Sequence, residues 1–442
     1  MGIELITGLM FGLFLMTLAL GIPLVFSLGA IAVAFAWALW GPQGLYVVAV
    51  QTFGVISKEI FVAVPLFIFM GNLLQRSGTA DALYEMMYRW SGRLPGGLAI
   101  GTIAVSTLIA AMSGVAGAAA VSLGLFALPS MLDRGYSKSV AMGCIMGGAT
   151  LAILIPPSVT MVIFGTFSLM SIGQFFIAGV MPGIMIAIMF IIYLIGASIR
   201  NPKIAPPLPP ERRASWKEKF ASLIAMLPAL LVIASVLGSI FTGAATPSEA
   251  AGVGVVGTLV VAAIYRQLNW KMVKESCFRT VRVTSMVMWI IIGASIFAAV
   301  YQRLGASQLM RSLLVGQELS PMLIMAGILV LILIMGMFLD SVAIIILLVP
   351  IVCPTVVDLG FNLLHFATLF IVAIMVGYLT PPFGLCLFYM RGVAPPEIST
   401  GEIYRAVIPY IGILLIALAI LTVFPDITLW LPRLIVGRDI VG

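Results

Sequence analysis

Two short stretches of sequence decide the fold, Leu154-Ile155-Pro156-Pro157-Ser158 and Leu379-Thr380-Pro381-Pro382-Phe383-Gly384. Each places two adjacent prolines inside a long apolar run. Proline lacks the amide hydrogen that a helix needs, and its ring clashes with the preceding turn, so a break is predicted in both helices. Carbonyls without partners in an apolar medium cost several kcal/mol each, so they must be buried against protein or bind a ligand.

The two stretches lie at matching points of a duplicated sequence. Five positions recur 225 residues later: Pro129, Asp133, Gly135, Pro156 and Pro157 return as Pro354, Asp358, Gly360, Pro381 and Pro382. Internal repeats of this kind are typical of secondary transporters. The alternative is a duplication that serves stability alone, in which two copies of a helical unit are fused.

Composition explains why both stretches are embedded in apolar sequence. Of the 442 residues, 62% are hydrophobic and only 9% are charged, too few to cover a soluble protein of this length. Apolar runs of about 20 residues, the length of a membrane span, recur along the chain, for example over 3–20, 181–199 and 322–339. We expect an all-α polytopic membrane protein with roughly ten to twelve spans, two of them re-entrant hairpins.

Chemistry-bearing residues are scarce, which excludes several classes of function. His365 is the single histidine, and the four cysteines form no CxxC pair. Zinc motifs, HExxH and GxxxxGK[ST] are absent, and no basic, aromatic-interleaved patch favours nucleic acid. We therefore predict no enzyme, no cofactor and no metal beyond a coupling ion. A membrane-embedded enzyme is the distant alternative, but the paired acids or Ser-His and Ser-Lys motifs it requires are not found.

One stretch breaks the apolar pattern decisively, residues 200–219, which read RNPKIAPPLPPERRASWKEK. Proline and basic residues dominate this segment, so it cannot span a membrane and is predicted to be a linker. Its lysines and arginines place it in the cytoplasm by the positive-inside rule. The linker divides the chain into two nearly equal halves.

Each half also contains a polar, glycine-rich point between two apolar arms of about 15 residues. These points are Ser113–Gly117 and Gly336–Ser341. The arms are short for full crossings, so each pair of arms is predicted to be a re-entrant hairpin whose tip lies near mid-membrane. A tip that faces a broken helix offers free carbonyls, which are ligands for a hard cation such as Na⁺. The alternative for each break is an ordinary proline kink.

Acidic residues near these points are few. Asp340, at the second tip, is the best ionisable candidate, and capping of the following helix is its alternative and compatible role. Glu249, in Thr246-Pro247-Ser248-Glu249, is expected to stabilise the first turn of a helix rather than to bind substrate. Residues 76–93 carry charges at helical spacing and are predicted to form an amphipathic segment.

At the tips and breaks the sequence resembles the large membrane subunit of tripartite ATP-independent periplasmic (TRAP) transporters. The resemblance covers essentially the whole chain in the right order. The matching stretches are Ile22-Pro23-Leu24, PLFIFMGNLL from Pro65, MSG from Met112, LIPPS from Leu154, FIAGVMPG from Phe176, TPSEAA from Thr246, GMFLD from Gly336 and LTPPFGLCLF from Leu379.

The resemblance implies an elevator-type transporter in a bacterial inner membrane, with two inverted repeats. It implies two protein partners besides the bilayer: a small four-helix membrane subunit and a periplasmic substrate-binding protein. The expected function is Na⁺-coupled import of a small organic anion, such as a dicarboxylate or keto acid. The runner-up is a stand-alone Na⁺- or H⁺-coupled dicarboxylate or citrate symporter that needs no binding protein.

Carried over by position, the resemblance also implies site residues. The expected Na⁺ ligands are Ser113, Gly114, Ala152, Ile155 and Pro157 in the first repeat, and Gly336, Phe338, Asp340, Gly377 and Thr380 in the second. The expected substrate contacts are Ser113, Ser158, Ser341 and Pro382. The chain departs from many members of the family at Ala116, Ala152 and Ala373, where Ser, Gly and Asn respectively are common.

The expected division of the chain follows from these features. Scaffold helices with the amphipathic segment occupy 1–97, and a second scaffold segment occupies 220–320. The first transport repeat is 98–199, with hairpin 98–135 and broken helix 138–167. The second is 321–430, with hairpin 321–358 and broken helix 362–392. The linker is 200–219, and 431–442 form a C-terminal tail.

Overall fold

The computed structural model describes residues 2–92, 94–207, 214–305 and 320–437, apart from the side chains of 80, 81, 110–113 and 225. Within these ranges the chain is helical, with short 3-10 segments and no strand. Nine helices in the described ranges are long and apolar enough to cross a membrane. The all-α, polytopic architecture predicted from the sequence is therefore confirmed. Parts of the predicted linker, second scaffold segment and tail lie outside the described residues.

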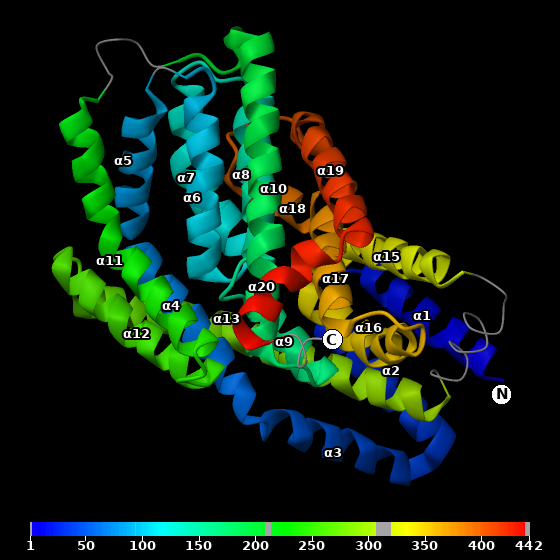
Figure 1. Ribbon diagram of the computed structural model, residues 1–442. Helices are drawn as coiled ribbons and strands as arrows, with labels where there is room; N and C mark the ends of the chain where they lie inside the picture. Colours follow the sequence, from blue (N-terminus) through cyan, green and yellow to red (C-terminus); the bar gives the residue numbers. More distant parts are fainter. Residues whose placement is uncertain (1, 93, 208–213, 306–319, 438–442) are drawn as a thin grey trace.

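The first set of helices, called here the outer group, comes from two separate parts of the chain. Helix α13 packs against α2 and α4, whereas α12 packs between α4 and α11, so the two parts form one unit (Figure 1). The members are α1 (Ile3–Ala19), α2 (Leu24–Trp40), α3 (Gly44–Ile56), α4 (Ala63–Arg76), α5 (Thr79–Ser91), α11 (Trp216–Phe241), α12 (Pro247–Ile264) and α13 (Trp270–Arg303).

Helix α12 begins where the sequence predicts it. Thr246 is its N-cap and accepts a hydrogen bond from the Glu249 amide, and the Glu249 carboxylate accepts one from the Thr246 amide at 2.8 Å. Pro247 occupies the first helical position, where its missing amide hydrogen costs nothing. The predicted helix-start role of Glu249 is confirmed.

The remaining helices form two repeats. The first consists of α6 (Gly97–Ser113), α7 (Ala116–Leu132), α8 (Lys138–Thr150), α9 (Val159–Ser168) and α10 (Ile172–Arg200). The second consists of α15 (Pro321–Phe338), α16 (Ser341–Asp358), α17 (Leu363–Leu379), α18 (Leu385–Val393) and α19 (Thr400–Val423), after which α20 (Asp426–Val436) packs on α10. Helices α16 and α17 start 225 positions after α7 and α8, so the duplication read from the sequence is a structural one.

The broken helices form the centre of the molecule. Every residue of α17 from Leu364 to Leu379 is buried, as is every residue of α8 from Val140 to Thr150. The repeats interlock, because α9 packs on α16 of the other repeat and α18 packs on α7 (Figure 1). An uninterrupted apolar run buried on all sides has no polar face, which explains the lack of periodicity in these segments.

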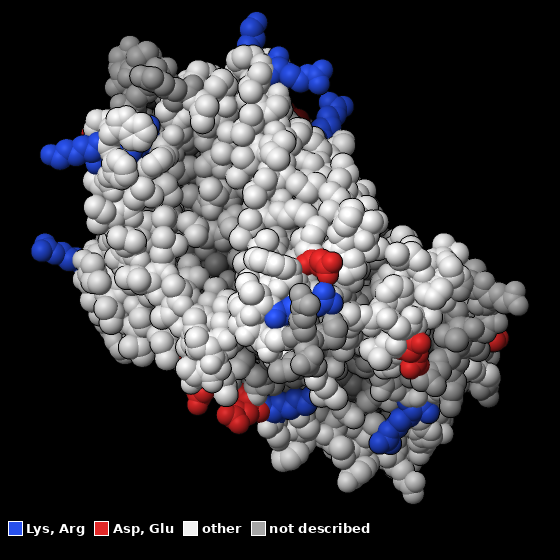
Figure 2. Space-filling model, viewed as in Figure 1, with Lys and Arg blue, Asp and Glu red and all other residues white. Residues whose placement is uncertain are grey.

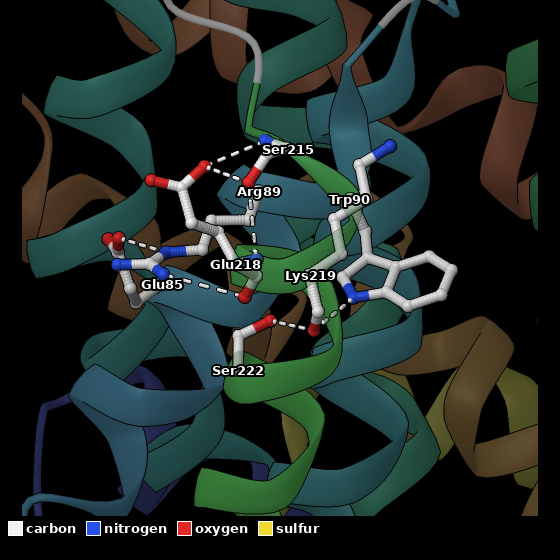
Figure 3. A network of polar contacts seen from close by, with 7 residues as sticks. All are labelled: Glu85, Arg89, Trp90, Ser215, Glu218, Lys219 and Ser222. Atoms are coloured by element: carbon white, nitrogen blue, oxygen red, sulfur yellow. Dashed lines mark hydrogen bonds and ion pairs between the residues drawn. The ribbon is translucent and has the colours of Figure 1, made fainter.

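A polar network joins the C-terminal end of α5 to the start of α11 (Figure 3). Ser215 and Glu218 form a capping box that starts α11. From α5, the Trp90 indole donates to the Lys219 carbonyl at 3.2 Å, and the Arg89 guanidinium donates to the Glu218 carbonyl at 3.4 Å. The far end of the linker is therefore attached to the outer group.

The near end of the linker is attached to the first repeat. The Ala205 carbonyl accepts from the Gly96 amide and the Ile204 carbonyl accepts from the Ser137 amide, both at 2.9 Å. The face of the molecule in Figure 2 is largely uncharged. Its few Lys and Arg residues are scattered along the upper, left and lower sides and near the centre of the view, and a hollow lies near the middle. Such a surface is typical of a protein surrounded by lipid.

Candidate functional site

The first hairpin tip lies directly against the first broken helix. Gly114 joins α6 to α7 with φ of +60°, a left-handed conformation that favours glycine. A Cβ atom at Gly114 would stand 3.0 Å from the Pro157 carbonyl oxygen and 3.2 Å from the Val159 amide nitrogen. The turn can therefore approach the break this closely only because residue 114 has no side chain.

At this break a side chain replaces one of the hydrogen bonds that proline removes. In a continuous helix the amide of residue 157 would donate to the Ile153 carbonyl, but Pro157 has no amide hydrogen. The Ser158 hydroxyl donates to that carbonyl instead, at 3.0 Å, and accepts from the Met161 amide as the N-cap of α9. Pro156 likewise cannot donate to the Ala152 carbonyl, which explains why this carbonyl is a candidate ligand.

The second tip and second break meet in the same way. A Cβ atom at Gly377 in α17 would stand 2.7 Å from the Cα atom and carbonyl carbon of Gly336 in α15, so the two backbones touch. Thr380 follows directly as the C-cap of α17, with its hydroxyl donating to the Val376 carbonyl at 2.7 Å. Both Pro-Pro bonds, 156–157 and 381–382, are cis. The prediction that each tip faces a break holds for both repeats.

Asp340 starts α16 and is held by two neighbours. One carboxyl oxygen accepts from the Val342 amide at 3.0 Å, so the predicted capping role is confirmed. The other accepts from the Tyr378 hydroxyl at 3.1 Å. That hydroxyl in turn accepts from the Ser341 amide at 2.7 Å. Tyr378 thus ties the break of α17 to the tip of the second hairpin.

The two repeats are also joined across the tips. The Thr160 hydroxyl, in the first turn of α9, lies 3.3 Å from the Ser341 hydroxyl, in the first turn of α16, and both side chains are buried. Neither residue has a hydroxyl at the equivalent position 225 residues away, where Leu385 and Ala116 stand. This contact between the repeats therefore has no counterpart at the equivalent pair of positions.

A cavity of about 230 Å³ opens beside both tips. It is bounded by the starts of α7, α9 and α16 from the repeats and by α4 and α13 from the outer group. The polar or charged residues that line it are Asn72, Gln75, Thr160, Arg279, Asp340, Ser341, Tyr378 and Tyr389. The rest of the lining is apolar or glycine, which is the usual balance for a small-molecule site.

The residues predicted from the sequence fall into two sets. Asp340 and Ser341 line the cavity. Ser158 and Pro382 do not: the Ser158 hydroxyl serves the helix break, and the Pro382 carbonyl accepts from the Tyr404 hydroxyl at 2.6 Å. The predicted Na⁺ ligands lie at the two tips and breaks, where Phe338 packs on Phe383 with ring centroids 5.4 Å apart. The Ser113 side chain lies outside the described residues.

Sequence reasoning missed the outer side of the cavity. Arg279, Asn72 and Gln75 come from helices that carry neither a tip nor a Pro-Pro break. Asn72 lies within the matching stretch PLFIFMGNLL, but that stretch does not indicate which of its residues faces a site. Arg279 could have been found from the sequence, because it is a charged residue on a long helix just before the apolar part of that helix. Tyr378 could have been found from the sequence, because its hydroxyl stands at the end of an otherwise apolar run, two residues before Thr380.

The duplicated broken helices, the central cavity and the apolar surface define a multi-pass helical membrane protein built around a cavity. The fold is shared with solved transporters. The YdaH transporter of Alcanivorax borkumensis superposes with a TM-score of 0.63 at 16% identity, over 88% of this chain and 89% of that one. MtrF of Neisseria gonorrhoeae gives 0.61 at 12% identity, over 88% and 85%.

Sequence comparison is more specific. The family model described as the tripartite ATP-independent periplasmic transporter, DctM component, matches residues 11–427. The chain therefore belongs to the family of large membrane subunits of TRAP transporters, as the resemblance predicted. It is 30% identical to the C4-dicarboxylate TRAP transporter large permease of Vibrio cholerae, over 98% of this chain and 99% of the other. It is 33% identical to the sialic acid TRAP transporter large permease of the same organism, over 94% and 96%.

Proposed function

We propose that this chain is the large membrane subunit of a Na⁺-coupled transporter in a bacterial inner membrane. It imports a small organic anion that a periplasmic binding protein delivers, together with a small four-helix membrane subunit. The observation that carries the proposal is the cavity, which is bounded by both hairpin tips on one side and by α4 and α13 on the other. Relatives named for C4-dicarboxylate, sialic acid and ectoine transport support an organic solute as the cargo.

The coupling ion is assigned to the two tip-and-break contacts. Unwound backbone supplies carbonyl oxygens, which suit Na⁺, and half-helices are used in this way in other secondary transporters. The first site takes the turn at Gly114 with the carbonyls of residues 152, 155 and 157. The second takes residues 336, 338 and 340 with 377 and 380. The same tips border the cavity, so ion and substrate would be bound by one set of elements.

The transport step is proposed to be an elevator movement of the repeats against the outer group. The cavity lies at the boundary between these two sets of helices, so a relative displacement would carry its tip-lined wall away from α4 and α13. The repeats would act as the transport domain and the outer group as the scaffold. The basic linker and the basic start of α13 (Lys271, Lys274) lie on the cytoplasmic side in this scheme.

The test is uptake into proteoliposomes that contain this chain, its small subunit and a candidate binding protein. Uptake should require an inward Na⁺ gradient and the binding protein together. Asp340→Asn keeps an N-cap but removes the charge, so it should reduce Na⁺-dependent uptake while the protein still folds. Asp426→Asn, an exposed position on α20, is the matched control and should transport normally.

Two outcomes would change the proposal. Uptake with Na⁺ but without any binding protein would favour the stand-alone dicarboxylate or citrate symporter. Uptake that is indifferent to Na⁺, with Asp340→Asn equal to the control, would remove the ion sites from the proposal.

A further inference from the structure

The outer wall of the cavity carries one charged group that nothing else in the described structure neutralises. Arg279, on α13, is half-buried and lines the cavity. Among the described residues it has no hydrogen bond or ion pair. Glu275, one turn earlier on the same helix, is the natural partner at this spacing but forms its ion pair with Arg76 from α4. Arg279 therefore lines the cavity with a guanidinium that has no partner among the described residues.

The position of Arg279 is set by its surroundings. The Asn72 amide of α4 donates to the hydroxyl of Thr280 at 3.0 Å, and both side chains are buried. This bond attaches α13 to α4 next to Arg279. The side-chain carbonyl oxygen of Gln75, which also lines the cavity, accepts from the Ser122 hydroxyl at 3.3 Å, so the NH₂ group of Gln75 is the part that can donate to a ligand. Both groups offered here, guanidinium and amide, are donors suited to a carboxylate.

The rest of the same helix face is apolar. Val283, Met286 and Val287 follow Arg279 at intervals of four, seven and eight residues, and all four line the cavity. These spacings place them in one stripe along α13. A ligand whose carboxylate meets Arg279 would therefore lay its remaining atoms against aliphatic side chains.

The opposite wall offers no cation to a second negative charge. Asp340 is the other charged residue in the lining, and its two carboxyl oxygens already accept from Val342 and Tyr378. In the proposed function this carboxylate also belongs to the second Na⁺ site, so it is not available to the ligand. The described lining offers no second lysine or arginine, so a second carboxylate on the ligand would enter a confined, weakly polar space without a cationic partner, which costs energy.

We propose that Arg279 anchors the substrate by its carboxylate, and that the substrate is an organic acid with a single carboxylate on an aliphatic body. A branched 2-oxo acid has this chemistry. This inference rests on the proposed function, since it names the substrate class for the same cavity. It separates this chain from relatives whose printed names refer to C4-dicarboxylates.

The test measures ligand binding directly, on the full chain reconstituted in lipid nanodiscs with Na⁺ present. Thermal unfolding midpoints are recorded against concentration of 4-methyl-2-oxopentanoate and of succinate. The first acid should raise the midpoint, and succinate should bind at least about tenfold more weakly, a difference of roughly 1.4 kcal/mol. Arg279→Gln should weaken binding of the first acid by about tenfold or more, and Arg279→Lys should retain part of it.

Arg282→Gln is the matched control, because Arg282 lies on the same helix but is exposed and outside the cavity lining. It should bind as the unchanged protein does. The ligand-free midpoint of each variant shows whether it folds, and if Arg279→Gln does not, Arg279→Lys and the choice between the two acids decide. Equal or tighter binding of succinate, unchanged binding by Arg279→Gln, or no binding of either acid would overturn the inference. If Na⁺-driven uptake by Arg279→Gln equals that of the unchanged protein, the inference about Arg279 is wrong but the proposed function stands. If the unchanged protein shows no Na⁺-driven uptake, that result counts against the proposed function alone.

Discussion

Tyr378 is the residue whose removal should report most directly on the second tip. Its hydroxyl accepts from the Ser341 amide at 2.7 Å and donates to the Asp340 carboxyl at 3.1 Å, and the ring is fully buried. Tyr378→Phe keeps the ring and removes only the oxygen. An amide left unpaired in a buried site costs about 1–3 kcal/mol, and the lost bond to the carboxyl adds about 1 kcal/mol. We expect the variant to be less stable by about 3 kcal/mol.

The assay is thermal unfolding in nanodiscs. An unfolding entropy of about 2 cal/mol/K per residue converts 3 kcal/mol into a fall in Tm of roughly 3 °C for 442 residues. Tyr389→Phe is the matched control, because Tyr389 lines the same cavity and its hydroxyl makes no hydrogen bond to the described residues. It should shift Tm by less than about 1 °C. Equal shifts for the two variants would refute the assignment of Tyr378 as the tie between tip and break.

Two further substitutions test the tip-and-break contacts. Gly377→Ala should prevent close packing of α17 on α15, because the new Cβ atom would stand 2.7 Å from the Gly336 backbone. The yield of folded protein should therefore fall sharply. Gly327→Ala is the control and should be tolerated, because a Cβ atom there would have no other atom within 4 Å. Ser158→Ala removes both the cap of α9 and the bond to the Ile153 carbonyl, so it should lower stability by about 1–2 kcal/mol, measured as a fall in Tm relative to Ser168→Ala. A tolerated Gly377→Ala or a neutral Ser158→Ala would contradict the geometry described for the breaks.

The sequence predicts the repeat architecture closely because its strongest signals are backbone signals. Adjacent prolines remove amide donors wherever they occur, so the breaks at 156–157 and 381–382 do not depend on tertiary context. The same is true of the cap at Asp340 and the helix start at Glu249. Such local rules determine where helices begin and end, and the structure follows them.

The binding cavity could not be derived in this way. Its outer wall is formed by α4 and α13, whose cavity residues are about 200 positions apart in the chain, and the pairing of Asn72 with Thr280 has no local signature. Ser158, in contrast, is predicted as a substrate contact and has another role. A hydroxyl beside a break is a reasonable ligand by composition, but the structure uses it to repair the helix. Whether a polar side chain serves the backbone or a ligand depends on distances that a sequence pattern does not contain.

The two attachments of the linker limit how far apart the parts of the molecule that it joins can lie. Its start is bonded to the first repeat through Ile204 and Ala205, and its end is clamped to α5 through Glu218 and Lys219 (Figure 3). Nine residues, 206–214, lie between Ala205 and Ser215, the N-cap of α11, and the ten extended steps from residue 205 to residue 215 span at most about 35 Å. Under the proposed elevator movement, the length of this segment sets an upper limit on how far residue 205 of the first repeat can be displaced from the start of α11 in the outer group.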